Sequence, residues 1–175
     1  MREDEKQCGF CGAAVDASLS RICTECFARN EEDARFCTAC GSACTGPLVA
    51  YGADPLPCPV CAVDMPARMI GSFATNECPR CNGLFVPNDH FDALVDAAVA
   101  ARRAKQIEML VPEPRRNGAN PVSQEVAYRR CPICEGHMQR RNFRQRSGVI
   151  LDVCRDHGTW LDADELEQVA GFILT

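Results

Sequence analysis

Residues 131–169 read CPICEGHMQRRNFRQRSGVILDVCRDHGTWLDADELEQV, and this stretch predicts the fold. It opens with a C-x-x-C motif, Cys131 to Cys134, and continues to Cys154-Arg-Asp-His157, where a histidine takes the second ligand position. Between these motifs, the strand-forming runs MQRRNF and VILDVC flank a Ser-Gly turn at 147–148. A hairpin brings its two ends together, so we expect the four side chains to close one tetrahedral metal site.

The residues after His157 predict a packed aromatic side chain and then a helix. Trp160 is expected to pack against the hairpin. Asp162 is expected to cap the helix, with Glu165 in the third position of an Asp-containing capping box. The predicted apolar face of this helix consists of Leu161, Leu166, Val169, Ala170 and Ile173.

The same pattern occurs once more, over residues 58–97. Here Cys58-Pro-Val-Cys61 is followed by Cys78-Pro-Arg-Cys81, which predicts a second four-ligand site. Each copy therefore consists of a C-x-x-C motif, a β-hairpin, a second motif, an aromatic residue and a helix.

Aligning Gly83 with Gly158 places Phe85 on Trp160, so the two aromatic residues hold equivalent positions. In the first copy the predicted helix starts near Asn88 and extends to about residue 110.

A third cysteine-rich segment occupies residues 1–46. Its seven cysteines are Cys8, Cys11, Cys23, Cys26, Cys37, Cys40 and Cys44. We expect the pairs 23/26 and 37/40 to share one metal ion, because only ten residues separate them. The remaining three cysteines would form a fourth site with a ligand from elsewhere. In the alternative pairing, the pair 8/11 joins 23/26 and leaves the last three cysteines together.

These patterns predict a small, metal-stabilised α+β protein made of tandem zinc ribbons, two of which are followed by a helix. The expected domains are a Cys-rich module at 1–46, a ribbon with an extended helix at 56–110, and a ribbon with a C-terminal helix at 127–175. The Pro-, Gly- and Asn-rich segment 111–126 predicts a linker. Across it, we expect the last ribbon to fold independently of the first.

Metal ligation is favoured over disulfide bonds by the spacing of the 14 cysteines, of which twelve form six C-x-x-C pairs. The N-terminus, MREDEKQCGF, is charged and has no apolar signal-peptide core. No apolar run is long enough to span a membrane. We therefore expect a reducing, cytoplasmic environment, where such cysteines bind metal. The cofactor expected is Zn²⁺, at three complete sites and a possible incomplete fourth.

The segments 58–97 and 131–173 resemble the bacterial transcription factor IIB-type zinc ribbon family, with its CPxC motif, later knuckle, G-x-W-hydrophobic-D run and acidic helix start. That resemblance implies that His157 is the fourth ligand of its site. The first copy departs from the pattern, because Leu84-Phe85-Val86-Pro87 replaces the Trp-hydrophobic-Asp run. Residues 8–44 resemble double zinc ribbon modules, with seven cysteines in place of eight. The chain as a whole resembles bacterial multi-ribbon proteins.

The charge distribution suggests two kinds of partner. The net charge of the whole chain is −5, but residues 102–146 hold 11 basic and 4 acidic side chains. A basic middle between acidic ends is suited to protein contacts, and a protein-binding adaptor is the favoured function. The alternative is nucleic-acid binding by the Arg-rich hairpin at 129–146. The candidate contact residues for either partner are Arg140, Arg141, Arg144 and Arg146.

An enzymatic role is not expected. A hydrolytic zinc site needs an open coordination position and a general base, whereas each complete site here has four Cys or His ligands. A zinc-linked thiol redox switch or chaperone is a minor alternative, because three of the pairs have the C-P-x-C form.

Overall fold

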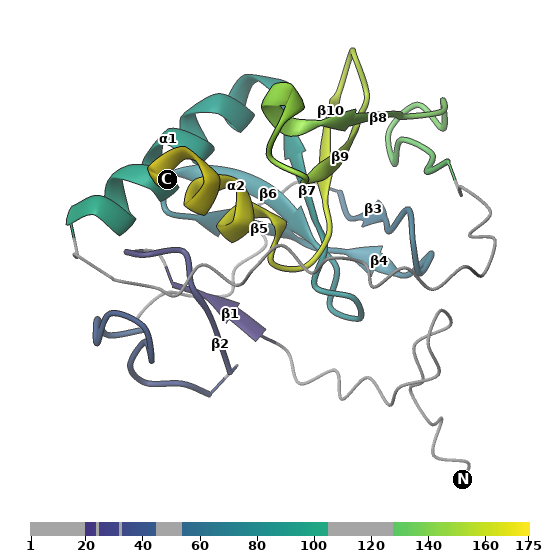
Figure 1. Ribbon diagram of the computed structural model, residues 1–175. Coiled ribbons are helices and arrows are strands. Elements are labelled where there is room, and N and C mark those ends of the chain that lie inside the picture. The colour runs from purple at the N-terminus through teal and green to yellow at the C-terminus, as the bar shows by residue number, and fades with distance from the viewer. Residues whose placement is uncertain (1–19, 24, 32, 45–53, 105–127) are drawn as a thin grey trace, which may run out of the picture.

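The computed structural model describes residues 20–23, 25–31, 33–44, 54–104 and 128–175. Within these ranges the chain contains two α-helices and antiparallel sheets, which confirms the predicted small α+β class (Figure 1). The N-terminal segment forms a two-stranded ribbon, β1 (Ser20–Ile22) and β2 (Arg29–Glu31).

The two sequence copies have matching elements. The first copy consists of β3 (Leu56–Pro57), β4 (Asp64–Met65), β5 (Ala67–Ile70), β6 (Phe73–Glu77), β7 (Leu84–Pro87) and α1 (Asn88–Ala104). The second consists of β8 (Gln139–Asn142), a 3₁₀ turn (Phe143–Gln145), β9 (Ile150–Val153), β10 (Gly158–Leu161) and α2 (Glu165–Leu174). Both predicted hairpins are present, as β5–β6 and β8–β9. Helix α1 starts at the predicted residue, and the part predicted beyond 104 lies outside the described ranges.

The two copies share one six-stranded sheet, in the order β5-β6-β7-β10-β9-β8. Strands β7 and β10 pair antiparallel at its centre, with Trp160 opposite Phe85. This pairing argues against the independent folding expected across the linker, because the central strand of each copy is hydrogen-bonded to the other. Sequence spacing reports contacts within a copy and contains no signal for this pairing.

The shared sheet has an approximate internal twofold symmetry. Trp160 and Phe85 are equivalent positions of the repeat and face each other, so the strand order reads the same from either edge. The junction is also reciprocal at two glycines. The Trp160 ring lies against Gly83, and the Phe85 ring lies against Gly158. A Cβ at Gly158 would lie 2.7 Å from the Phe85 ring and 2.5 Å from a β7 carbonyl oxygen. The sequence predicted only that Trp160 packs on its own hairpin.

Both helices cover the same face of the sheet and lie side by side, as Figure 1 shows. Their apolar faces form a single core with the inner strands rather than one core for each copy. The buried members of this core include Leu84, Val86, Leu94, Leu161, Leu166 and Val169. A second cluster surrounds the Trp160–Phe85 pair and includes Met65 and Met138, the equivalent methionines.

The predicted cap of α2 is only half correct. The helix begins at Glu165, and Asp164 precedes it in the left-handed conformation (φ 69°) with no side-chain cap. The Glu165 carboxylate accepts the Asp162 backbone N–H at 2.7 Å, as a capping box requires. The Asp162 carboxylate, however, accepts two bonds from Arg129, at 2.6 and 2.8 Å, and one from the Trp160 indole at 3.0 Å. It therefore fixes the junction aromatic residue instead of the helix.

The reciprocal packing predicts a strong effect of Gly83→Ala. The added methyl group would overlap the Trp160 ring, which cannot move because it is 1% exposed. We expect the free energy of unfolding of the zinc-loaded protein to fall by about 2–3 kcal/mol or more. Thermal unfolding followed by circular dichroism measures this change.

Gly136→Ala is the matched control. The carbonyl oxygen of Gly136, like that of Gly83, accepts the backbone N–H of the first cysteine of a C-x-x-C motif. The nearest atom to a Cβ there is the Cys134 sulfur, at 3.4 Å. Equal melting temperatures for the two variants would show that Trp160 does not lock the two copies together.

Candidate metal centres

Three groups of four side chains each converge on one point. Their ligand atoms lie within 4.8 Å of one another in each group. The groups are Cys23, Cys26, Cys37 and Cys40; Cys58, Cys61, Cys78 and Cys81; and Cys131, Cys134, Cys154 and His157. Within the second group, the Cys58 and Cys81 sulfurs are 3.7 Å apart and the Cys61 and Cys78 sulfurs 3.9 Å apart. A tetrahedron with Zn–S bonds of about 2.3 Å places its sulfurs about 3.8 Å apart. Each group could therefore hold a metal ion such as zinc.

A repeated backbone turn presents the cysteines. In the turn at 58–63, the Cys58 N–H donates to the Val63 carbonyl oxygen at 2.8 Å, and the Ala62 N–H donates to the Cys58 carbonyl oxygen at 2.9 Å. The N–H groups of Val60 and Cys61 point at the Cys58 sulfur, 3.4 Å away. Such hydrogen bonds stabilise a thiolate and orient it toward a metal.

The residue after each second cysteine turns the chain sharply. Five turns share this feature, with positive φ at Phe27, Gly41, Ala62, Asn82 and Glu135. A left-handed residue at this position directs the chain back into a strand and costs non-glycine residues about 1 kcal/mol. Repeated strain of this kind indicates that the turn is held by the four-ligand group.

The turn that contains His157 is one residue shorter than the turn at 58–63. Cys154 N–H donates to the Gly158 carbonyl oxygen at 2.8 Å, so β10 begins directly after the histidine. His157 Nδ1 lies 3.4 Å from the Cys154 sulfur and 3.8 Å from the Cys131 sulfur. Nδ1 is thus the nitrogen that faces the metal position.

Burial of the thiols affects how they would bind metal. Burial raises the pKa of Cys131 to about 11 and that of Cys61 to about 12. These thiols therefore keep their protons at neutral pH in the metal-free protein. Binding of a metal ion must release those protons, so metal affinity falls as the pH falls.

The structure pairs 23/26 with 37/40, which is the first of the two pairings considered for the N-terminal segment. Cys44 packs against this group but is not one of the four, and its N–H donates to the Arg35 carbonyl oxygen at 2.8 Å. Cys8 and Cys11 lie outside the described residues, so the fourth site stays a prediction.

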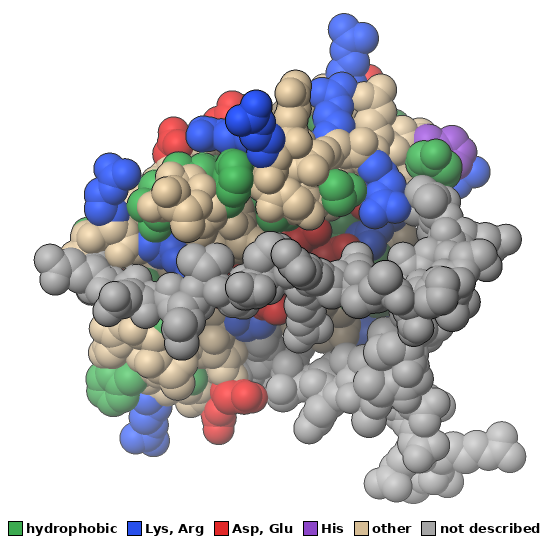
Figure 2. Space-filling model, in the orientation of Figure 1, with side chains coloured by type: hydrophobic (Ala, Val, Ile, Leu, Met, Phe, Trp, Pro, Cys, Tyr) green, Lys and Arg blue, Asp and Glu red, His purple; other side chains and the backbone are tan. Residues whose placement is uncertain are grey.

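The four candidate arginines of the hairpin are exposed, with Arg140 and Arg141 on β8 and Arg144 and Arg146 in the turn that follows. Arg side chains are prominent over the half of the molecule that contains β8, β9 and β10 (Figure 2). Arg129 differs from them, because it binds Asp162 and also Asp152 at 3.2 Å.

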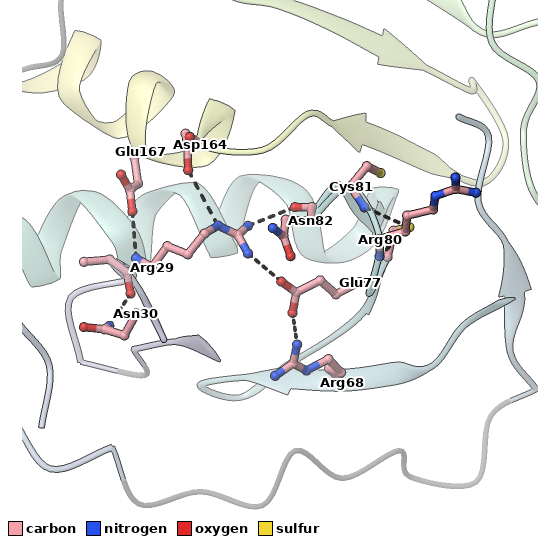
Figure 3. Close-up of polar contacts among 11 residues, drawn as sticks. Arg29, Asn30, Arg68, Glu77, Arg80, Cys81, Asn82, Asp164 and Glu167 are labelled. Atoms are coloured by element: carbon pink, nitrogen blue, oxygen red, sulfur yellow. Dashed lines mark hydrogen bonds and ion pairs between the residues drawn. The ribbon is translucent and has the colours of Figure 1, made fainter. Parts of the chain in front are cut away.

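Sequence reasoning missed a buried ion cluster on the other half of the sheet. Glu77, 2% exposed at the end of β6, pairs with Arg68 of β5 and with Arg29 of β2 (Figure 3). Nothing in the run FATNECPRC marks this carboxylate as buried. The cluster attaches the N-terminal ribbon to the first copy.

Neither helix in the described ranges has the length and apolar character needed to cross a lipid bilayer. No protein-family model, curated protein or solved structure matches the chain. The three ligand groups are consistent with zinc-ribbon-like modules.

We predict that the purified full chain carries three or four zinc ions. Replacing both Cys58 and Cys81 with serine should lower that number by one, because these thiols belong to a single group. Native mass spectrometry of protein purified without chelator gives the count directly. Cys44→Ser is the control and should leave the three described sites filled. One equivalent or none in the unmodified protein would rule out structural zinc.

Proposed function

We propose that the protein is a cytoplasmic, non-enzymatic adaptor in which zinc ribbons of the transcription factor IIB type hold a rigid surface for a protein partner. The observation that supports this most directly is that each described ligand group has four Cys or His side chains. A zinc ion held by four protein ligands has no open position for substrate or activated water, and acts structurally. Thiolates engaged in this way are also poor redox catalysts, which disfavours the thiol switch.

The edge strand β8 supports partner binding at the Arg-rich hairpin. All four residues of β8 are exposed, and the strand is the last in the sheet. An edge strand offers unpaired backbone groups to which an extended segment can add. Arg140, Arg141 and the two turn arginines would select a segment with acidic side chains.

Nucleic-acid binding is less well supported by the same hairpin. Base stacking needs exposed aromatic rings, and the hairpin offers two candidates. Tyr128 meets this requirement, since it is 63% exposed. Phe143, the other candidate, is partly buried, contacts Phe172 edge-on and lies under the Arg144 guanidinium. Arg129 is held by two aspartates. The basic and aromatic groups available to a nucleic acid are therefore fewer than the sequence suggests.

Affinity capture with nuclease treatment separates the two functions. The zinc-loaded full chain is used as bait, beside a variant in which Arg140, Arg141, Arg144 and Arg146 are all replaced by glutamine. We expect a nuclease-resistant protein partner whose capture is weakened in the variant, while the melting temperature stays unchanged because solvated charges contribute little to stability.

The matched control replaces Arg35, Arg80 and Arg103 with glutamine, since these are also exposed and none of them belongs to the second copy. Two results together would contradict the adaptor function and favour nucleic-acid binding. They are the loss of all captured protein on nuclease treatment and the retention of RNA or DNA by the untreated bait.

A further inference from the structure

The internal twofold symmetry gives each half of the sheet a groove beside the helix of the other copy, and the N-terminal ribbon fills one of them. This first groove lies between the start of α2 and strands β6 and β7. Phe27 of the ribbon is 6% exposed and joins the main core there, together with Ile22. The walls next to them include Leu84 and Leu166. An apolar segment from outside the repeat thus occupies the first groove.

Arg29 fixes the ribbon in this groove by polar contacts, which Figure 3 shows. Its guanidinium donates to the Glu77 carboxylate at 2.8 Å and to the Asn82 carbonyl oxygen at 2.9 Å. Its backbone N–H donates to the Glu167 carboxylate at 3.1 Å. The first groove therefore recognises an apolar side chain together with a positive charge two residues further along the chain.

Among the described residues, no segment from outside the repeat fills the equivalent groove of the second copy. Strand register and the aligned cysteines give the equivalent pairs: Leu84 with Thr159, Leu166 with Phe91, Glu167 with Asp92, Arg68 with Arg141, and Glu77 with Val153. All five second-copy residues line one cavity of about 320 Å³ between the start of α1 and the β8–β9 hairpin. The apolar part of its lining includes Phe143 and Leu151.

The two grooves differ in charge at one decisive position. In the first groove, Glu77 neutralises Arg68. In the second groove Val153 stands in its place, so the described strand beside the equivalent Arg141 offers it no carboxylate. Arg144 also lines this cavity, and among the described residues neither arginine forms an ion pair. Of the described residues in the lining, Asp92 at the start of α1 is the one acidic residue.

We propose that this open groove binds a partner segment in which an apolar side chain is followed, two residues later, by a carboxylate. The apolar side chain would take the place that Phe27 has in the first groove. The carboxylate would pair with Arg141 and Arg144, as Arg29 pairs with Glu77 but with the charges reversed. This inference rests on the proposed adaptor function and specifies the partner's chemistry.

Paired peptides test the charge reversal directly. Two fluorescein-labelled nine-residue peptides differ only at one position, with a central Phe-Ala-Glu in one and Phe-Ala-Arg in the other. Binding to the zinc-loaded full chain is followed by fluorescence anisotropy. We expect the Glu peptide to bind at least about tenfold more tightly. In Arg141→Glu the preference should disappear or reverse.

Arg103→Glu is the matched control, because Arg103 is exposed at the opposite end of α1 from the groove. It should leave the preference for the Glu peptide unchanged. Equal binding of the two peptides, no binding of either, or the same preference in Arg141→Glu would overturn the proposal. Two further results would also overturn it, because each would identify a different occupant of the groove. One is a dimer of this chain that depends on Arg141 in sedimentation, and the other is displacement of the Glu peptide by single-stranded RNA.

The failure of this inference can be told apart from failure of the adaptor function. If Arg141→Glu captures its nuclease-resistant partner at the level of the unmodified bait, the groove proposal is wrong and the adaptor function stands. If the unmodified bait captures no nuclease-resistant protein, the adaptor function itself is wrong.

Discussion

The antiparallel pairing of β7 with β10 is the contact on which the rest of the structure depends. It places Trp160 and Phe85 opposite each other, and each ring takes the space left by the other copy's glycine. Around this pair, one buried cluster includes cysteines from both metal groups of the repeat. Truncating a fully buried aromatic residue costs about 3–5 kcal/mol, which is a large part of the stability that so small a unit can have. Metal binding in one copy therefore supports a core that the other copy shares.

Much of the local structure could be predicted from the sequence, because the signals are local. The spacing of Cys131, Cys134, Cys154 and His157 identified one ligand group, and the Ser-Gly turn identified the hairpin between its motifs. The start of α1 at Asn88 was also correct. Each of these follows from residues fewer than about 30 positions apart, where spacing and turn chemistry decide the geometry.

The contacts between segments could not be predicted in this way. The pairing of β7 with β10 joins residues more than 70 positions apart, and LFVP looks like any short apolar strand. Asp162 has the sequence position of a helix cap, but the nearby Arg129 and the Trp160 indole take its carboxylate. Glu77 looks like an ordinary charge before a cysteine until the ribbon brings Arg29 to it. In all three cases a partner more than 30 positions away in the chain changes the role of the residue, which a single sequence does not reveal.

The shared core makes one measurement decisive for this account. Hydrogen exchange of the zinc-loaded full chain is compared with that of a variant in which Cys131 and Cys154 are both replaced by serine, after mass spectrometry has shown the loss of one zinc ion. If the two copies form one cooperative unit, amides of β7 should lose protection together with those of β10, because each strand is hydrogen-bonded to the other. Loss of protection confined to residues 128–175, with β7 as protected as in the unmodified chain, would contradict the account.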